Sequence, residues 1–332
     1  MKQKADNLPK IQHYVPQFIL RNFCFKNEHL YVFDKKTENV FPTHTKNVAA
    51  ENGFYNFQIE DSEFTIDPNF TDLETNAAGV FEKIIKQESL SNITKDEKLE
   101  LSIFVSAQFT RTKHLRIIAE QLSNTLVLQI EKMGINPKNV IGLNANKEEE
   151  FIKDVILFTA DSVLENAPVF NSREWVLFKS TEVENYYISD NPITLHNTIN
   201  QKMKGNLGLA VKGIEVYFPI SPKLSIGIFD RANTETVREN YRVIKNMDEE
   251  KRKGYRIDDK TIQAIQDLIQ GLEYGVAVQA KNEEVLFQNS LQVVFSTRFI
   301  YSINQDFSLV KELLKNNPEY KEPPQIYGNR IN

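Results

Sequence analysis

Hydrophobic and polar positions change their period twice along the chain. Between His29 and His44, apolar and polar residues alternate on both sides of a polar turn, which predicts a β-hairpin. From about residue 70 to 165, apolar residues recur every three or four positions, so we expect amphipathic helices there. Beyond residue 174 the pattern returns to short segments rich in Val, Ile, Tyr and Phe, which are typical of strands.

The helical region is predicted to contain three helices. The first covers 71–87. The second runs over 94–134 without a breaker, either as one long helix or as two with a kink near Asn124. The third covers 147–166 and should end before Pro168, because proline disrupts a helix interior.

These patterns together predict an α+β fold. A central helical region (about 70–165) would be packed with short, mostly antiparallel strands from the N-terminal and C-terminal parts. A chain of 332 residues fits one large domain over 1–332. The alternative is a split into a mainly helical part, 1–168, and a mixed strand and helix part, 169–332. The apolar segment 285–303 is compatible with either helix or strand.

Composition narrows the classes of function. Apolar residues make up 41% and charged residues 26%, as in water-soluble globular proteins, and the net charge of -5 argues against a surface that coats nucleic-acid backbone. A local basic groove for nucleic acid remains compatible with this balance. The single cysteine, Cys24, provides neither a disulfide nor a cysteine metal site. No signal-peptide core and no apolar run of membrane-spanning length is present, so we expect a cytoplasmic protein without a membrane segment.

Standard catalytic signatures are missing from the sequence. It contains no GxxxxGK[ST], GxGxxG, HExxH, GxSxG or CxxC motif, and its five histidines have no metal-ligand spacing. These absences argue by motif against the familiar nucleotide-binding, zinc and serine-hydrolase classes. The candidate site residues of this chain lie in three less common patterns.

The first such pattern is HYVPQFILR. His13 precedes a helix opened by Pro16, and Gln17 and Arg21 would share one face of that helix. A residue at this place can face an anion held by free backbone N–H groups. In the alternative interpretation, His13 bonds a backbone carbonyl and Arg21 pairs with a carboxylate.

The second pattern is SAQFTRTKH, inside the predicted long helix. Gln108 lies within an apolar stripe, and Arg111 lies one turn further on. A buried glutamine without partners costs about 1–3 kcal/mol, so Gln108 must be hydrogen-bonded. The two side chains either form a buried pair that holds a neighbouring loop or belong to a rigid site.

The third pattern is YYISDNPITLH, where a strand runs into Asp190 and Asn191. These residues favour a turn by themselves, but a carboxylate at the end of a strand can also bind a metal or act as a base, with His196 nearby in sequence. Glu74 is a further carboxylate. It would complete a capping box with Thr71, and it is also a reserve metal ligand.

Four motifs occur in a characteristic order: HYVPQFILRNF, QFTRT, ISDNPI and FPISP. In this respect the sequence resembles the bacterial domain-of-unknown-function family 4238, whose members open with an HYVPxFxLRxF-like segment. The resemblance extends from about His13 to the segment QNSLQVVFSTRFIYS. It implies no agreed activity. The residues that it places at motif positions are His13, Pro16, Gln17, Arg21, Gln108, Arg111, Asp190, Asn191 and Pro192.

We favour a hydrolase or transferase that acts on a phosphorylated or nucleic-acid-like substrate, with a metal-dependent nuclease as a special case. His13 would be the general acid or base. Asp190 would orient His13 or hold a divalent metal such as Mg²⁺ or Mn²⁺, with Glu74 as a second metal ligand. Phosphate or another anion would be bound by Arg21, Arg111, Gln17, Gln108 and Asn191.

The alternative hypothesis is a non-catalytic binding or regulatory module. The polar motifs would then form a buried network that fixes one packing of an aromatic-rich core. Function would lie on another surface, such as the glycine-containing segment 197–213, which we expect to be a loop. The two hypotheses differ in whether the motif side chains are occupied by each other or left open to a ligand.

Overall fold

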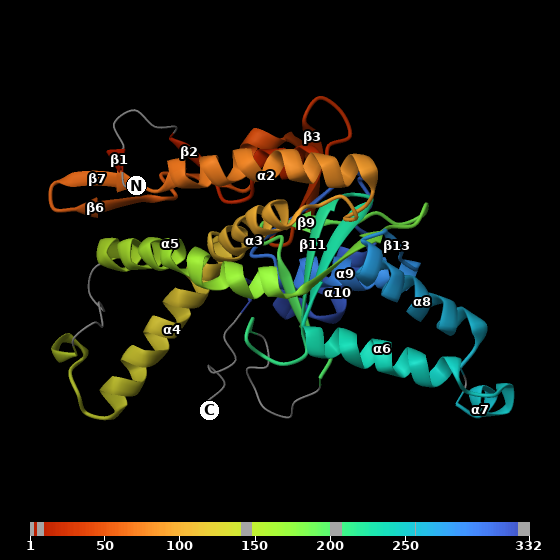
Figure 1. Ribbon diagram of the computed structural model, residues 1–332. Coiled ribbons are helices and arrows are strands. Elements are labelled where there is room, and N and C mark those ends of the chain that lie inside the picture. Colours follow the sequence, from red (N-terminus) through yellow and green to blue (C-terminus); the bar gives the residue numbers. More distant parts are fainter. Residues whose placement is uncertain (1–2, 5–9, 141–147, 200–207, 256, 325–332) are drawn as a thin grey trace.

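The structure is a computed structural model that describes residues 3–4, 10–140, 148–199, 208–255 and 257–324 (Figure 1). Its fold is α+β, as the sequence predicts. None of the helices in these ranges combines the length and apolar composition needed to cross a bilayer.

A five-stranded sheet forms the centre of the C-terminal half. β12 (Leu224–Phe229) is buried at every position, including the small residues Ser225 and Gly227 that alternate with its Leu and Ile side chains. Neighbouring strands are antiparallel except β13, which lies parallel to β8. The order is β10 (Thr194–Asn197), β11 (Ile214–Ser221), β12, β8 (Glu174–Lys179) and β13 (Val278–Gln279).

A four-stranded antiparallel sheet joins segments that are far apart in the sequence. The predicted hairpin of β3 (His29–Asp34) and β4 (Asn39–His44) is confirmed. β14 (Phe299–Ser302) pairs with β3 on one side and with β9 (Ile188–Ser189) on the other. This sheet brings the start of the chain beside its C-terminal part.

Two small sheets complete the N-terminal region. β2 (Ile11–His13) pairs with β5 (Ala50–Asn52), so the first sequence motif begins on a strand. The other small sheet consists of β1 (Gln3–Lys4), β7 (Ser62–Thr65) and β6 (Asn56–Ile59).

The helical region follows the predicted order with three corrections. The first helix begins at Asp67 and not at residue 71, because Pro68 is accommodated in its first turn. The second predicted helix is two helices, separated at Arg111 and not near Asn124. The third continues through Pro168, flanked by the buried Ala167 and Phe170. The bounds are α1 Gln17–Arg21, α2 Asp67–Gln87, α3 Lys95–Thr110, α4 Lys113–Lys132 and α5 Glu148–Ser172.

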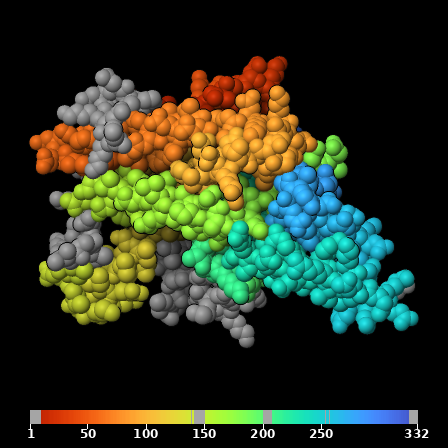
Figure 2. Space-filling view, in the orientation of Figure 1, coloured from red at the N-terminus to blue at the C-terminus, as the bar shows by residue number. Residues whose placement is uncertain are grey.

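Among the described residues, the C-terminal part adds five helices. The ambiguous segment 285–303 contains both predicted structures, since it covers most of a helix and then β14. Figure 2 shows that α4 and the α6–α7 region stand out at opposite ends of the molecule. The helices are α6 Arg231–Lys245, α7 Glu249–Gly254, α8 Asp259–Tyr274, α9 Asn282–Phe295 and α10 Ser308–Asn316, with 3-10 turns at Thr45–Asn47, Pro137–Asn139 and Pro318–Lys321.

Aromatic side chains link the layers in the core. Phe18 follows the first residue of α1, and its ring centroid lies 5.9 Å from that of Phe81 on α2 and 5.5 Å from that of Phe104 on α3. The rings of Phe81 and Phe104 in turn contact Phe218 on the central sheet. Such tilted and edge-to-face pairs add about 0.5–1.5 kcal/mol each beyond their buried area. The first motif is thereby fixed against both α2 and α3.

Candidate functional site

The junction between α3 and α4 organises the motif residues. Arg111 ends α3, and Thr112 adopts an extended backbone conformation before α4 starts. Both residues are buried, and their side chains bond to different parts of the chain. The Arg111 side chain contacts α2, whereas the Thr112 hydroxyl donates to Asn191 Oδ1 at 3.0 Å. The second and third motifs therefore meet at this junction.

The guanidinium of Arg111 is held within a closed polar and aromatic site. Nε donates to Gln108 Oε1 at 2.9 Å, and Nη1 donates to Glu74 Oε1 at 2.8 Å. The rings of Phe70 and Phe104 lie 5.0 and 5.7 Å from the guanidinium carbon. Glu74 thus balances the buried charge of Arg111 and does not cap its helix, so the capping-box interpretation of Glu74 is wrong.

Gln108 connects this cluster to the first motif. Its Nε2 donates to the carbonyl oxygen of Tyr14 at 2.9 Å, so both ends of the buried amide are satisfied as predicted. The Tyr55 hydroxyl donates to the carbonyl oxygen of Arg111 at 3.3 Å and lies 3.4 Å from that of His13. These bonds hold the end of β2 against the end of α3.

His13 is close enough to this cluster for Arg111 and Arg21 to affect its titration. Burial lowers the pKa of His13, and the two arginines lower it further, whereas hydrogen bonds to the backbone at Thr45 and Lys46 act in the opposite direction. The imidazole is therefore neutral at pH 7. Within the described residues, the buried Nε2 of His13 and the buried Nη2 of Arg111 both have no hydrogen-bond partner.

Gln17 and Arg21 lie at the exposed edge of the same region. Arg21 Nη2 donates to Gln17 Oε1 at 3.3 Å, which confirms that the two side chains share a face of α1. Arg21 Nε also lies 3.1 Å from Glu28 Oε1, and the opposite oxygen of Glu28 lies 3.6 Å from His44 Nε2. Arg21 therefore has a carboxylate partner, as the alternative interpretation of this motif expects.

Asp67 is a member of this cluster that the sequence interpretation missed. Burial raises its pKa to about 6, and the negative charge of Glu74 contributes, while Arg111 opposes the rise. The signal in the sequence is Pro68, which is favoured in the first turn of a helix and would place Asp67 at the start of α2. Asp67 is thus a second carboxylate whose charge interacts with those of Glu74 and Arg111.

Replacing Asp67 with asparagine is expected to stabilise the protein at neutral pH. Because the pKa in the folded state is higher than in the unfolded chain, the folded state binds the proton more tightly, and the free energy of unfolding falls as pH rises from about 4 to about 6. The melting temperature of Asp67→Asn relative to the parent should therefore increase over this window and then level off. A difference that stays constant from pH 4 to pH 8 would contradict this, and the exposed Asp61→Asn provides the control.

Asp190 has a structural role, because its carboxylate binds residues 297–299; we call this set of bonds the Asp190 clamp. The fully buried carboxylate accepts hydrogen bonds from Thr297 N (2.7 Å), the Thr297 hydroxyl (2.6 Å), Arg298 N (2.8 Å) and Phe299 N (2.9 Å). Burial raises the pKa of Asp190, and the bonds from Thr297 and Phe299 oppose that rise. The clamp fixes the turn before β14.

Asn191 extends the clamp to the α3–α4 junction. It accepts from the Thr112 hydroxyl, and its Nδ2 donates to the carbonyl oxygen of Phe295 at 3.2 Å. His196 faces a different environment, since it pairs across the sheet with Glu215 and its ring meets Phe287 edge-on. The structure therefore divides the predicted site residues into two sets, His13, Gln17, Arg21, Glu74, Gln108 and Arg111 in one and Asp190 and Asn191 in the other.

The two carboxylates considered as metal ligands have other partners. Glu74 is paired with Arg111, and Asp190 is bonded to residues 297–299. In the part of the chain that the structure describes, no three His, Cys, Asp or Glu side chains are grouped in a way that could hold a metal ion.

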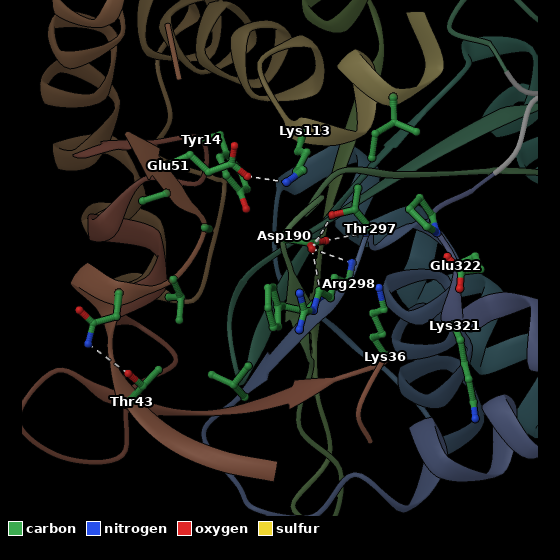
Figure 3. A pocket seen from close by; sticks show the side chains of 18 of the residues that line it. Tyr14, Lys36, Thr43, Glu51, Lys113, Asp190, Thr297, Arg298, Lys321 and Glu322 are labelled. Carbon is green, nitrogen blue, oxygen red and sulfur yellow. Dashed lines mark hydrogen bonds and ion pairs between the residues drawn. The ribbon is translucent and has the colours of Figure 1, made fainter. Parts of the chain in front are cut away.

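A cavity of about 600 Å³ borders the first motif at Tyr14 (Figure 3). Tyr14 and Asp190 form part of its wall, so two motif segments contribute to it. Figure 3 shows Asp190 between the Lys113–Glu51 pair and the side chains of Arg298 and Lys36. The cavity is also lined by Val32, Phe41, Thr43, Ile117, Phe299, Lys321, Glu322 and Pro323.

Cationic side chains are prominent around this cavity, and the sequence interpretation identified none of them. Lys113 Nζ lies 2.6 Å from Glu51 Oε1. Arg298 binds Asp34 through two bonds of 2.9 and 2.7 Å, and Lys321 pairs with Glu38. The ammonium group of Lys36 has no ion-pair partner within the described residues. Lys36 and Lys321 lie on turns outside the sequence motifs, whereas Lys113 lies within SAQFTRTKH, beside the residues that were singled out there.

The fold and its polar clusters define an α+β protein with a closed arginine–carboxylate cluster and a buried aspartate that contributes to the wall of a cavity. The chain belongs to the family described as protein of unknown function DUF4238, whose model matches residues 11–306. The predicted resemblance is thereby confirmed. No curated protein and no solved structure shows significant similarity to the chain.

Proposed function

We propose that this protein is a binding module for a small ligand and that the cavity beside Tyr14 and Asp190 is its site. The observation that carries the proposal is the convergence of polar side chains from sequence-distant segments on one cavity of about 600 Å³, a size typical of ligand sites. We also propose a cytoplasmic location, since the single thiol of Cys24 indicates no need for an oxidising compartment.

The motif residues support this role by fixing the cavity wall. Gln108 holds the backbone of Tyr14, and Asp190 holds the backbone of Arg298 and Phe299. Each of these held residues lines the cavity. A wall fixed by buried hydrogen bonds lowers the cost of ordering the site when a ligand binds.

Filling the cavity is expected to abolish ligand-dependent stabilisation. The parent and Thr43→Trp would be compared by thermal unfolding with a set of anionic, neutral and cationic small molecules. A compound at 100 times its Kd adds about 2.7 kcal/mol, or roughly 5 °C, to the parent. The tryptophan should remove this gain by occupying the cavity, because Thr43 lines it on the edge strand β4.

The control for this comparison is Thr75→Trp, at an exposed position on α2. It should respond to the compounds as the parent does. Compounds that stabilise the parent and Thr43→Trp equally would place binding elsewhere. A set in which no member stabilises the parent would contradict the binding module.

A second candidate function is hydrolysis or transfer on a phosphorylated or nucleic-acid-like substrate. One observation favours it: His13 Nε2 and Arg111 Nη2 are both buried without a partner among the described residues. A neutral imidazole can act as a general base, and a guanidinium can hold a phosphate oxygen. In the metal-dependent nuclease form of this proposal, Asp190 is engaged through both oxygens, and Glu74 Oε1 is bonded to Arg111, so further ligands would be needed.

A further inference from the structure

We infer that the cavity binds a phosphate monoester of about mononucleotide size, with its phosphate at Lys36 and Arg298. This inference rests on the proposed binding function and specifies the chemical class of the ligand. It depends on three properties of the lining: its cationic side chains, the engagement of nearby carboxylates, and an apolar area suited to the body of a ligand.

The lining carries four cationic side chains, Lys36, Lys113, Arg298 and Lys321, beside the carboxylates of Glu51, Asp190 and Glu322. Lys113 gives one N–H to Glu51, and Arg298 gives Nε and Nη2 bonds to Asp34. Together with the Lys36 ammonium, which pairs with no carboxylate in the described chain, this leaves about eight N–H groups for a ligand. A ligand rich in acceptor oxygens complements such a lining, and phosphate is the most acceptor-rich common group.

The carboxylates near these donors are largely engaged. Asp34 uses both oxygens for Arg298 and also accepts from the Lys36 backbone N–H and the Thr37 hydroxyl. The oxygens of Asp190 are occupied by residues 297–299. The Arg298 guanidinium therefore already has a carboxylate partner, whereas the Lys36 ammonium has none among the described residues, and Glu322 is a further carboxylate in the lining.

Lys36 and Arg298 lie close to one another because of the sheet pairing. Asp34 is the register partner of Phe299, so the end of β3 adjoins the start of β14. Lys36 follows β3 by two residues, and Arg298 directly precedes β14. Both side chains are exposed, and Lys36 can reorient toward an anion, whereas Arg298 would contribute the N–H groups that its bonds to Asp34 leave open. In Figure 3 their cationic ends lie on the same side of Asp190.

The rest of the lining fits an organic body. The cavity has about 600 Å³, far more than a bare phosphate occupies, and apolar side chains contribute to its wall. The Phe41 ring is 39% exposed and is available to stack on a planar group, whereas the Phe299 ring already has the Arg298 guanidinium 4.8 Å from its centroid. Lys113, on the far side of Asp190, would bind a second acceptor on this body.

Isothermal titration calorimetry with the four nucleoside 5′-monophosphates, the matching nucleosides and inorganic phosphate tests this inference. At least one monophosphate should bind the parent, and its nucleoside should bind at least tenfold more weakly. Lys36→Ala should weaken monophosphate binding about tenfold and Lys113→Ala less, while the exposed Lys86→Ala on α2 should leave it unchanged. Binding should also weaken as salt rises from 50 to 300 mM, because charges near the surface are screened.

Failure of this inference can be told apart from failure of the binding module. If no monophosphate binds at millimolar concentration, if nucleosides bind as well as monophosphates, or if Lys36→Ala behaves like Lys86→Ala, the inference is overturned. In that case, a neutral or cationic compound that stabilises the parent but not Thr43→Trp would still support the proposal that the protein is a binding module. Inorganic phosphate binding as tightly as every monophosphate would also overturn the assignment, because the organic body would then contribute nothing.

Discussion

Replacing Asp190 with alanine is expected to lower the melting temperature by roughly 6–10 °C. The carboxylate is fully buried and is the hydrogen-bond acceptor for the backbone N–H groups of Thr297, Arg298 and Phe299. Alanine leaves these donors without an acceptor in a site that it also leaves underfilled. Each buried donor left unsatisfied costs about 1–3 kcal/mol, so we expect a total loss of about 3–5 kcal/mol, and each kilocalorie shifts the midpoint of a chain of this size by about 2 °C.

Two further variants serve as comparisons for the loss of stability in Asp190→Ala. Thr297→Val removes only the hydroxyl bond to Asp190 and should cost about 1 kcal/mol. The exposed Asp61→Ala should leave the midpoint unchanged. Thermal unfolding followed by circular dichroism provides the comparison. If Asp190→Ala unfolds at or above the temperature of the parent, the carboxylate is retained at a cost to stability, as catalytic groups often are. The stabilising role assigned here to Asp190 would then be wrong.

Local signals account for the parts of the fold that the sequence predicted. The β3–β4 hairpin follows from alternation over a few residues, and α3 begins where the helical pattern starts, at a capping box of Thr94 and Glu97. The same rule failed for Thr71 and Glu74, since Pro68 opens the helix earlier and Arg111 provides a stronger partner for Glu74.

The candidate site was predictable only in part. His13 and Arg111 could be singled out because polar residues in apolar or motif contexts need partners, and the structure does bring their groups together. The cavity could not be predicted, since Lys36 and Arg298 meet only through the pairing of β3 with β14. That pairing joins positions more than 260 residues apart, and periodicity within either strand does not encode it.

Replacing Arg111 with methionine should also lower the melting temperature by roughly 6–10 °C. Methionine fills much of the space between the Phe70 and Phe104 rings, but it leaves Glu74 and Gln108 without their donor. The penalty of about 3–5 kcal/mol comes mainly from the partly buried carboxylate that loses its counter-charge. Glu74→Leu alone should be destabilising for the complementary reason, because it leaves a buried guanidinium.

The double variant Arg111→Met/Glu74→Leu separates the scaffold role of this pair from a catalytic one. An ion pair replaced on both sides by apolar groups is often nearly neutral, so the double variant should recover most of the stability and show a coupling of at least about 1 kcal/mol in thermal unfolding. If the cluster is a scaffold, the recovered protein should bind cavity ligands as the parent does. Independent losses that simply add would contradict the pairing. A stable double variant that has lost phosphodiester hydrolysis shown by the parent would instead establish the guanidinium of Arg111 as part of a catalytic site with His13.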